Sequence, residues 1–463
     1  MSALASSPVR EIDADAAVIG GGPAGSTVAD YLARAGLKVL VFERERFPRF
    51  RIGESLLPLN LPILRDLGLE DEMERRFLRK YAANFVDRHG ARQSRYPFAQ
   101  AINKNHPYSY EVERAEFDQM LIDNAERHGA EVFHETSVRE VLFEGDRAVG
   151  LRARTADGGE IRVRCPMTVD ASGRSAFLGS RLGMKHEIAL DSRTAFYSHF
   201  EDVERESGER EGDIQIVSFP HGWFWMIPFK GNTTSIGMVV TDGYLKTRNR
   251  DVAEALPPRP TGEHDGSNDA VAGRAAAIND AFLKRTIEAT PFVAERMRRA
   301  KQKFPSRSIG NFSYVMDRYA GDGYVLIGDA GAFLDPVFSS GVFLTMKSAQ
   351  VASRAILRAH ARRDYRARYF KIYERRIRAA QRIFFRFIHG WYDPAFLDLF
   401  FYSRNYFGLK TAITSVLAAD LFDPRHLWSL KLRVNLLFVI ARAHRWHLRL
   451  RRGGRSLVQQ MPV

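Results

Sequence analysis

The sequence of 463 residues has a single cysteine, Cys165. One cysteine excludes a disulfide within the chain and a metal site built from several thiolates. His444 and His447 are spaced to share one helix face, but arginines surround them, so a cationic surface is favoured over a pair of metal ligands. We therefore expect no metal ion, and a chain suited to the reducing cytoplasm.

Long apolar runs are also missing. The most apolar late stretch, residues 432–450, is interrupted by four arginines, whereas a membrane-spanning helix needs about 18 apolar residues in a row. An acidic, polar run that includes Glu11 and Asp13 precedes the first apolar segment, which argues against a secretion signal. We expect no spanning helix, and we favour packing of residues 432–450 against protein over peripheral contact with a membrane.

The rest of the composition is that of a globular protein, with 45% hydrophobic and 27% charged residues. The length predicts two or three domains, or one large domain with an inserted lobe. The net charge of +14 favours anionic partners such as nucleotide phosphates, acidic proteins or acidic lipids. No nucleic-acid-binding motif stands in its required context, so we expect no nucleic acid partner.

A glycine-rich turn near the start predicts a nucleotide site. An apolar run at 16–19 ends in G-x-G-x-x-G, a helical pattern follows, and a second apolar run at 37–42 ends in an acidic residue. In this β-α-β context the glycines allow a tight turn, close approach of a pyrophosphate and close packing of the helix, and the acidic residue accepts from ribose hydroxyls. The alternative is a tight turn without a ligand. The residues expected around the nucleotide are Gly20, Gly22, Pro23, Ala24, Gly25, Glu43 and Arg44.

NAD and FAD share this motif, and later segments distinguish between them. Residues 169–174 and 325–330 resemble the second and third signatures of large FAD oxidoreductases, and residues 113–118 resemble their arginine-bearing helix. The resemblance implies that Arg114, Asp170, Gly328 and Asp329 contact FAD. Each segment alone is an ordinary strand–turn–helix junction, but their order together indicates FAD. No second dinucleotide motif is visible for NAD(P)H, so we expect a separate flavin reductase to supply reduced FAD.

The resemblance then narrows to the flavin-dependent halogenases, over nearly the whole chain, and most to the branch that acts on phenols, pyrroles and carrier-tethered rings. Residues 47–58, F-P-R-F-R-I-G-E-S-L-L-P, resemble the halogenase segment that covers the flavin. The resemblance implies that Arg51, Ile52 and Ser55 bind the cofactor. The alternative is a surface loop between a strand and a helix.

The segment W-F-W-M-I-P at 223–228 matches the halogenase signature W-x-W-x-I-P. In the family these bulky residues separate the flavin from the organic substrate, so that the flavin does not hydroxylate it directly. The resemblance gives that role to Trp223, Trp225, Ile227 and Pro228. The alternative is that they are ordinary core residues of a strand.

The segment F-L-D-P-V-F-S-S-G at 333–341 resembles the halogenase signature F-x-x-P-x-x-S-x-G. The resemblance implies that backbone N–H groups of Ser340 and Gly341 hold a chloride or bromide ion, and that Pro336, Gly341 and Val342 contact the flavin. Small residues at a helix start leave donors exposed, which suits an anion. The alternative is a helix start that binds only flavin.

Lys80 follows Glu54 by 26 residues, close to where these halogenases keep their lysine. In the family this lysine holds hypohalous acid or forms a haloamine with it; the alternative is a solvated surface lysine. Two departures stand out. Phe338 replaces the glutamate of free-tryptophan halogenases, which argues against free tryptophan, and the usual glycine after the aromatic residue that follows the lysine is missing.

We predict an α/β fold: a Rossmann-type FAD-binding domain, an inserted β-rich substrate lobe and a C-terminal helical region. The FAD domain is assigned to residues 1–80, 105–185 and 310–355, the lobe to 81–104 and 186–309, and the helical region to 356–463. Residues 59–80 are expected to be helical, and a flexible loop is expected near 256–274.

The predicted function is an FAD-dependent halogenase that makes hypohalous acid from reduced FAD, oxygen and chloride or bromide. Lys80 relays it to an electron-rich aromatic substrate, phenol- or pyrrole-like, free or on an acyl or peptidyl carrier protein. One alternative is a flavin hydroxylase, epoxidase or dehydrogenase on the same scaffold, because fold does not fix chemistry. Another is a membrane-surface or complex-forming flavoprotein that uses its basic C-terminal region.

Overall fold

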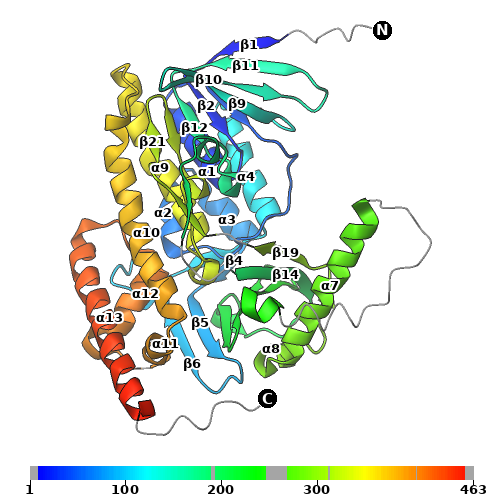
Figure 1. Cartoon of the computed structure of the whole chain (residues 1–463), viewed down its shortest axis with the longest axis vertical. Coiled ribbons are helices and arrows are strands. Elements are labelled where there is room, and N and C mark those ends of the chain that lie inside the picture. Colours follow the sequence, from blue (N-terminus) through cyan, green and yellow to red (C-terminus); the bar gives the residue numbers. More distant parts are fainter. Residues whose placement is uncertain (1–8, 189–192, 247–267, 311–312, 403, 454–463) are drawn as a thin grey trace.

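A mostly parallel sheet forms the centre of the upper half of the molecule (Figure 1). The computed structural model describes residues 9–188, 193–246, 268–310, 313–402 and 404–453, with the side chains of 268–272 and 449–453 left undescribed. The strand order is β21-β22-β12-β2-β3-β8, and β21 alone among them runs antiparallel to its neighbour. The bounds are β2 (Ala16–Ile19), β3 (Val39–Phe42), β8 (Glu131–Phe133), β12 (Thr168–Asp170), β21 (Ala320–Gly321) and β22 (Tyr324–Leu326).

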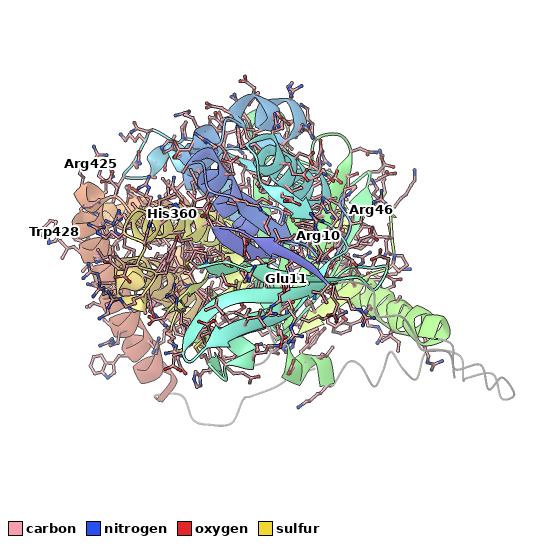
Figure 2. All side chains as sticks on the ribbon, turned by 90° about the horizontal axis from the view of Figure 1, so that it is seen from above. Arg10, Glu11, Arg46, His360, Arg425 and Trp428 are labelled. Carbon is pink, nitrogen blue, oxygen red and sulfur yellow. The ribbon has the colours of Figure 1, made fainter. Side chains whose placement is uncertain are left out.

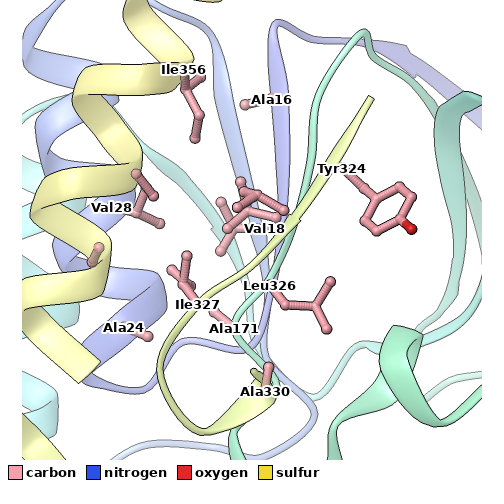
Figure 3. Close-up of a cluster of buried hydrophobic side chains, with 14 of the residues drawn as sticks. Ala16, Val18, Ala24, Val28, Ala171, Tyr324, Leu326, Ile327, Ala330 and Ile356 are labelled. Carbon is pink, nitrogen blue, oxygen red and sulfur yellow. The ribbon is translucent and has the colours of Figure 1, made fainter. Parts of the chain in front are cut away.

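Both faces of this sheet are covered, so every residue of its central strands β22, β12, β2 and β3 is buried. Helices α1 (Pro23–Arg34), α4 (Arg114–Arg127) and α9 (Ser340–Ala361) lie on one face. There Val18 of β2 packs among Val28 of α1 and Ile356 of α9 (Figure 3). Strands of a second, four-stranded sheet pack on the other face: β1 (Arg10–Asp13), β9 (Ser137–Glu144), β10 (Arg147–Arg154) and β11 (Glu160–Arg164).

The lower half is built on a larger, mainly antiparallel sheet. Helices α7 (Asn268–Glu288) and α8 (Pro291–Arg296) cover one face of it, where Phe282 packs beside Phe196 (Figure 1). Its strands are β5 (Ala82–Asp87), β6 (Gln93–Pro97), β14 (Arg193–Glu201), β15 (Ile214–Phe219), β16 (Gly222–Pro228), β17 (Thr233–Thr241), β18 (Lys301–Gln302) and β19 (Arg307–Gly310).

C-terminal helices run along the side of the molecule opposite α7 (Figure 1). They pack through an aromatic cluster in which Phe338 and Phe85 meet Trp391 and Phe400. Among the described residues, no helix is long and apolar enough to cross a membrane. The helices are α10 (Lys371–Trp391), α11 (Pro394–Phe400), α12 (Leu409–Leu417) and α13 (Pro424–Gly453).

The predicted helix over residues 59–80 is wrong at its C-terminal end. The chain forms α2 (Leu61–Asp66) and α3 (Glu70–Arg76), and then an extended residue, Phe77, ends the helix and leads into strand β4 (Leu78–Lys80). Strand β4 pairs antiparallel with β7 (Ser109–Glu111), which places Lys80 opposite Ser109. A partner strand distant in sequence overrides the local helical pattern here.

The predicted loop near 256–274 is also wrong in part, because α7 already begins at Asn268. Residues 256–267 lie outside the described residues. The predicted α/β class, with a β-rich second layer and helices from Ser340 to the C-terminal region, is confirmed. The division into three domains stays a prediction.

Candidate active site

A cavity of ≈ 780 Å³ lies where the parallel strands end. Its lining includes residues just past β2, β3, β12 and β22, together with β16 and the start of α9. Crevices beyond the carboxyl ends of parallel strands are the usual ligand sites of such sheets. The volume suits a large cofactor.

The glycine turn gives α1 its close approach to the sheet. Gly20 has φ +100°, and a Cβ on it would lie 2.6 Å from the carbonyl oxygen of Ala171. A Cβ on Gly25 would lie 1.8 Å from the carbonyl oxygen of Gly20. Larger residues therefore cannot replace these two glycines without moving backbone. The N-terminus of α1 consequently opens into the cavity, which Gly20, Gly22, Pro23 and Ala24 line and Gly25 does not.

Glu43 stabilises the same turn. Its Oε2 accepts the Gly21 N–H at 2.8 Å and its Oε1 accepts the Glu45 N–H at 3.0 Å. The side chain still lines the cavity, as do the predicted residues Arg44, Arg51, Ile52 and Ser55.

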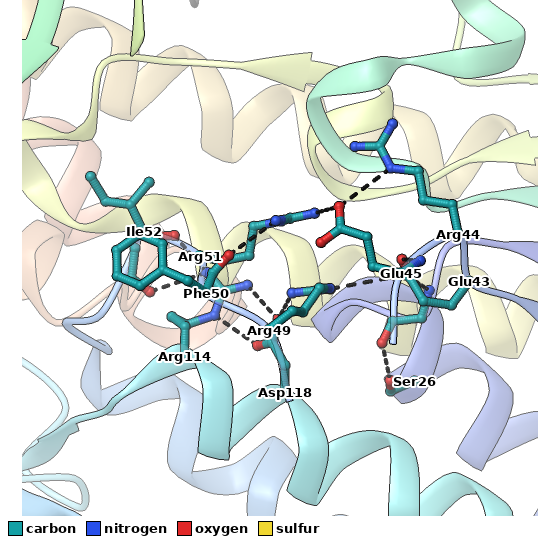
Figure 4. A network of polar contacts seen from close by, with 12 residues as sticks. Ser26, Glu43, Arg44, Glu45, Arg49, Phe50, Arg51, Ile52, Arg114 and Asp118 are labelled. Atoms are coloured by element: carbon teal, nitrogen blue, oxygen red, sulfur yellow. Dashed lines mark hydrogen bonds and ion pairs between the residues drawn. The ribbon is translucent and has the colours of Figure 1, made fainter. Parts of the chain in front are cut away.

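Arginines form a cationic wall around buried Asp118 (Figure 4). Asp118 accepts from Arg49 at 2.8 Å and from Arg114 at 2.7 and 2.9 Å. Arg114 also donates to the carbonyl oxygen of Ile52 at 2.7 Å, and Arg51 pairs with Glu45. Arg49 was missing from the predicted site, although the segment 47–58 contains it. Its guanidinium is placed by Asp118, which is distant in sequence.

Asp329 lies in a short 3₁₀ turn (Gly328–Ala330) after β22 and lines the cavity. Burial raises its pKa to about 6, against the opposing effect of Arg114 and Arg174.

Asp170, also predicted to contact FAD, has a different position. It does not line the cavity, and its carboxylate accepts the N–H groups of Ser172 and Leu178 at 3.0 and 2.7 Å. Its role in the structure is to hold the turn after β12.

These groups fit FAD. A helix N-terminus, a bare glycine turn and several arginines suit a diphosphate, and the buried carboxylate of Asp329 suits sugar or ribityl hydroxyls. FAD held by these residues in its reduced form would activate oxygen and so would supply the oxidising equivalent.

Strand β16 forms the bulky wall of the cavity. Trp223, Trp225 and Ile227 line it, whereas Pro228 does not. Gly237 on neighbouring β17 makes room for Trp225, since a Cβ there would lie 2.2 Å from the Trp225 ring. The indole N–H of Trp225 donates to Ser235 at 3.1 Å, which fixes the ring.

A hydrogen-bonded chain ties this wall to the predicted halide segment. The Trp223 indole donates to the Tyr392 hydroxyl at 3.0 Å, and that hydroxyl donates to Asp335 Oδ2 at 2.8 Å. Asp335 also caps the 3₁₀ turn Pro336–Phe338 by accepting the Val337 N–H at 3.0 Å. The segment is thereby held against β16 and α10.

The segment ends in the N-terminus of α9. Ser339 adopts a left-handed conformation with φ +53°, and α9 begins at Ser340. Ser340, Gly341, Val342 and Pro336 all line the large cavity. A Cβ on Gly341 would meet nothing within 4 Å, so the helix start faces open space. Exposed N–H groups and the positive end of the helix dipole suit a small anion there.

Lys80 lies beside this segment rather than in the large cavity. It lines a second cavity of ≈ 10 Å³, together with Leu57, Phe98, Phe338 and Ser339, among others. Ser339 also lines the large cavity, as do Ile214 and Ile216 of β15, so the two spaces share walls from two parts of the chain.

The Lys80 side chain is 1% exposed. It donates to Ser55 Oγ and to the carbonyl oxygen of Leu56, both at 2.7 Å, and lies 5.3 Å above the Phe98 ring. Burial lowers the pKa of Lys80, and Glu111 and Asp213 oppose that shift. Lys80 is therefore a buried lysine, not a solvated surface residue.

Glu111 was not predicted from the sequence. Its Oε1 lies 4.0 Å from Lys80 Nζ, and its side chain is fully buried. Burial raises the pKa of Glu111 to about 8, and Lys80 and Ser55 oppose the shift. The pairing of β4 with β7 brings Glu111 to Lys80, and one sequence carries no signal for that pairing.

His199 is a second residue near the site that the sequence did not predict. Its Nε2 lies 2.6 Å from Glu54 Oε1.

Comparison with known proteins identifies the family. A family model described as an FAD binding domain matches residues 13–301. A 1H-pyrrole-2-carbonyl-[peptidyl-carrier protein] chlorinase of Pseudomonas fluorescens is 29% identical over 90% of this chain and 96% of its own. The corresponding brominase of Pseudoalteromonas luteoviolacea is 33% identical over 77% of this chain and 80% of its own.

Among solved structures, the myxobacterial chondrochloren halogenase is 36% identical over 83% of each chain, with a TM-score of 0.70. Sequence and structure relatives thus agree with the signatures at 47–58, 223–228 and 333–341. The chain belongs to the flavin-dependent halogenases, a family of FAD-dependent oxidoreductases.

Proposed function

We propose that this enzyme halogenates an electron-rich, pyrrole- or phenol-like ring carried by an acyl or peptidyl carrier protein, with Lys80 as the relay for hypohalous acid. The observation that carries the Lys80 role is the position of Ser339, which borders both the cofactor-sized cavity and the small Lys80 cavity. Hypohalous acid formed beside Ser340 and Gly341 is separated from the small cavity by shared walls, Ser339 with Ile214 and Ile216 of β15.

Different residues bind FAD, bind the halide, exclude the organic ring and hold hypohalous acid. The glycine turn and the arginines around Asp118 hold the FAD diphosphate, and the N–H groups of Ser340 and Gly341 hold the halide. Trp223 and Trp225 keep the organic ring out of the large cavity, so that the oxidant reaches the ring only as hypohalous acid. Lys80 holds that acid by a hydrogen bond or as a haloamine.

The Lys80 cavity holds about one water molecule, so an aromatic ring needs its walls to move. Phe98 and Leu417, from the 3₁₀ turn Phe98–Gln100 and from α12, are the side chains suited to make room. Phe338 stands where free-tryptophan halogenases have a glutamate, which supports a pyrrole- or phenol-like substrate. The two carrier-protein halogenases among the relatives support a tethered one.

Purified protein with FAD, a flavin reductase, NADH, oxygen and bromide tests this function against a panel of phenols, indoles and pyrroles, free and carrier-tethered. Mass spectrometry should find the bromine isotope pattern on a carrier-tethered ring and none when bromide is omitted. Lys80→Ala should abolish it, and Lys104→Ala, at an exposed lysine, should not. Oxygenated or desaturated product regardless of halide would instead establish the hydroxylase, epoxidase or dehydrogenase alternative.

One face of α13 favours a second candidate role, binding to an anionic membrane surface. Trp428, Leu432, Val439 and Trp446 are exposed on one side of this helix, and Trp428 points outward in Figure 2. The helix sequence contains no acidic residue, and exposed Arg425, Lys431 and Arg442 flank the apolar residues. Aromatic and aliphatic side chains framed by cations suit an anionic bilayer surface.

Co-sedimentation with vesicles tests this second role. Vesicles rich in phosphatidylglycerol should retain the wild type, neutral phosphatidylcholine vesicles should not, and Trp428→Ser with Trp446→Ser should abolish retention. Equal recovery in the supernatant with both vesicle types would rule the role out.

A further inference from the structure

The buried surroundings of Lys80 contain three carboxylates, from different parts of the chain. Two of them have other side-chain partners: Asp213 accepts from Arg95 Nε at 2.6 Å, and Glu54 Oε1 lies 2.6 Å from His199 Nε2. The third, Glu111, has its ion pair with Lys80 itself, at 4.0 Å. Glu111 is therefore the carboxylate whose charge is tied to that of the lysine.

Ser55 contacts both residues, through its hydroxyl on one side and its backbone on the other. Its hydroxyl accepts from Lys80 Nζ at 2.7 Å, and its backbone forms an isolated antiparallel bridge with Glu111. Neither carboxylate oxygen of Glu111 has a hydrogen-bond partner in the described part of the chain, so Lys80 at 4.0 Å is the partner that the structure gives this carboxylate. Lys80 and Glu111 are both fully enclosed by protein, so no bulk water separates them.

We propose that Glu111 is the proton partner of Lys80, taking a proton from Nζ and returning it in each turnover, either through the Ser55 hydroxyl or after a side-chain movement that closes the 4.0 Å gap between Nζ and Oε1. This inference rests on the proposed function of Lys80. The Nζ–H bond breaks with its electron pair left on nitrogen, and an O–H bond forms on Glu111. Charge is conserved, because an ammonium and a carboxylate become an amine and a carboxylic acid.

The exchange lets a relay lysine act in both of the forms that the proposed function allows. As an ammonium it donates to the oxygen of hypohalous acid; as an amine it forms a haloamine with it, with release of water. Burial makes the exchange accessible, since desolvation disfavours both charged forms, lowering the pKa of Lys80 and raising that of Glu111 to about 8. Asp213 and Glu54 face the pair, and each contacts its own partner, the Arg95 guanidinium and the His199 ring.

The test compares wild type, Glu111→Gln and Glu111→Asp. The first readout needs no turnover: ε-¹⁵N-lysine NMR follows the titration of Nζ, and the Lys80 signal is assigned by its loss in Lys80→Ala. In Glu111→Gln the Lys80 midpoint should fall by about one pH unit or more, because the anion that stabilises the ammonium is gone. Glu111→Asp keeps a carboxylate and should shift it less.

The second readout is the ratio of halogenated ring to hypohalous acid released, the latter trapped by a soluble 1,3-diketone. Glu111→Gln should lower this ratio by about 10-fold or more while flavin oxidation continues, and Glu111→Asp should recover part of the loss. An unchanged Lys80 midpoint, or an unchanged ratio, in Glu111→Gln overturns the proposal. If the wild type halogenates nothing, the proposed function fails, while the NMR midpoint still decides whether Glu111 and Lys80 are coupled.

Discussion

Asp118 does not line the large cavity, yet it orients two arginines that do. Replacing it by asparagine removes the charge that both buried guanidinium groups share, and leaving buried charges uncompensated costs about 3 kcal/mol or more. We expect Asp118→Asn to weaken FAD binding at least about 10-fold. We also expect it to lower the free energy of unfolding by about 3 kcal/mol or more. Fluorescence titration with FAD and chemical denaturation measure both. Glu126→Gln, at an exposed position of the same helix, is the matched control, and equal effects of the two changes would contradict the role of Asp118.

The raised pKa of Glu111 should also make the stability of the folded protein depend on pH. Its folded pKa of about 8 lies above the ordinary value of 4.5, so the folded state holds a proton that the unfolded state has lost between these two pH values. Wild-type stability should therefore fall, relative to that of Glu111→Gln, as the pH rises from about 4.5 to about 8. The slope is at most about 1.4 kcal/mol per pH unit. Denaturation curves across this window measure it, and parallel pH profiles would contradict the raised pKa.

At the scale of single elements, a single substitution at the start of α9 can test halide binding separately from FAD binding. A Cβ on Gly341 meets no atom within 4 Å, so Gly341→Ala should leave stability unchanged. The added methyl group reaches into the cavity beside the proposed halide site, so the KM for bromide should rise several-fold with a smaller effect on FAD affinity. Steady-state kinetics with varied bromide measure this. An unchanged bromide KM would place the halide elsewhere.

Sequence motifs predicted those parts of the site that lie within one short segment of the chain. The glycine turn, the β16 tryptophans and the α9 start each carry their role in a short segment, and each lines the cavity. Contacts between distant segments were not predictable. Lys80 was expected on a helix but lies on β4, because β7 pairs with it, and Glu111, Arg49 and His199 reach the site only through such long-range contacts.

At the scale of the whole molecule, the net charge of +14 bears on the proposed partner. A basic enzyme attracts an acidic carrier protein mainly by long-range electrostatics, which salt screens. The KM for carrier-tethered substrate should rise several-fold between about 50 and about 300 mM salt, with kcat nearly constant. A free substrate analogue of the same ring, assayed in parallel, should show no such rise. Equal salt dependence of both substrates would argue against a charge-steered carrier.

The central claim is that hypohalous acid is made in the large cavity and used in the small one, two spaces that share Ser339, Ile214 and Ile216 as walls, with Lys80 required only in the second. The most direct test measures both activities in Lys80→Ala: total hypobromous acid by the soluble trap, and brominated ring by mass spectrometry. The variant should release hypobromous acid at close to the wild-type rate while ring bromination falls about 100-fold or more. Loss of both activities together, or retention of ring bromination, would contradict the claim.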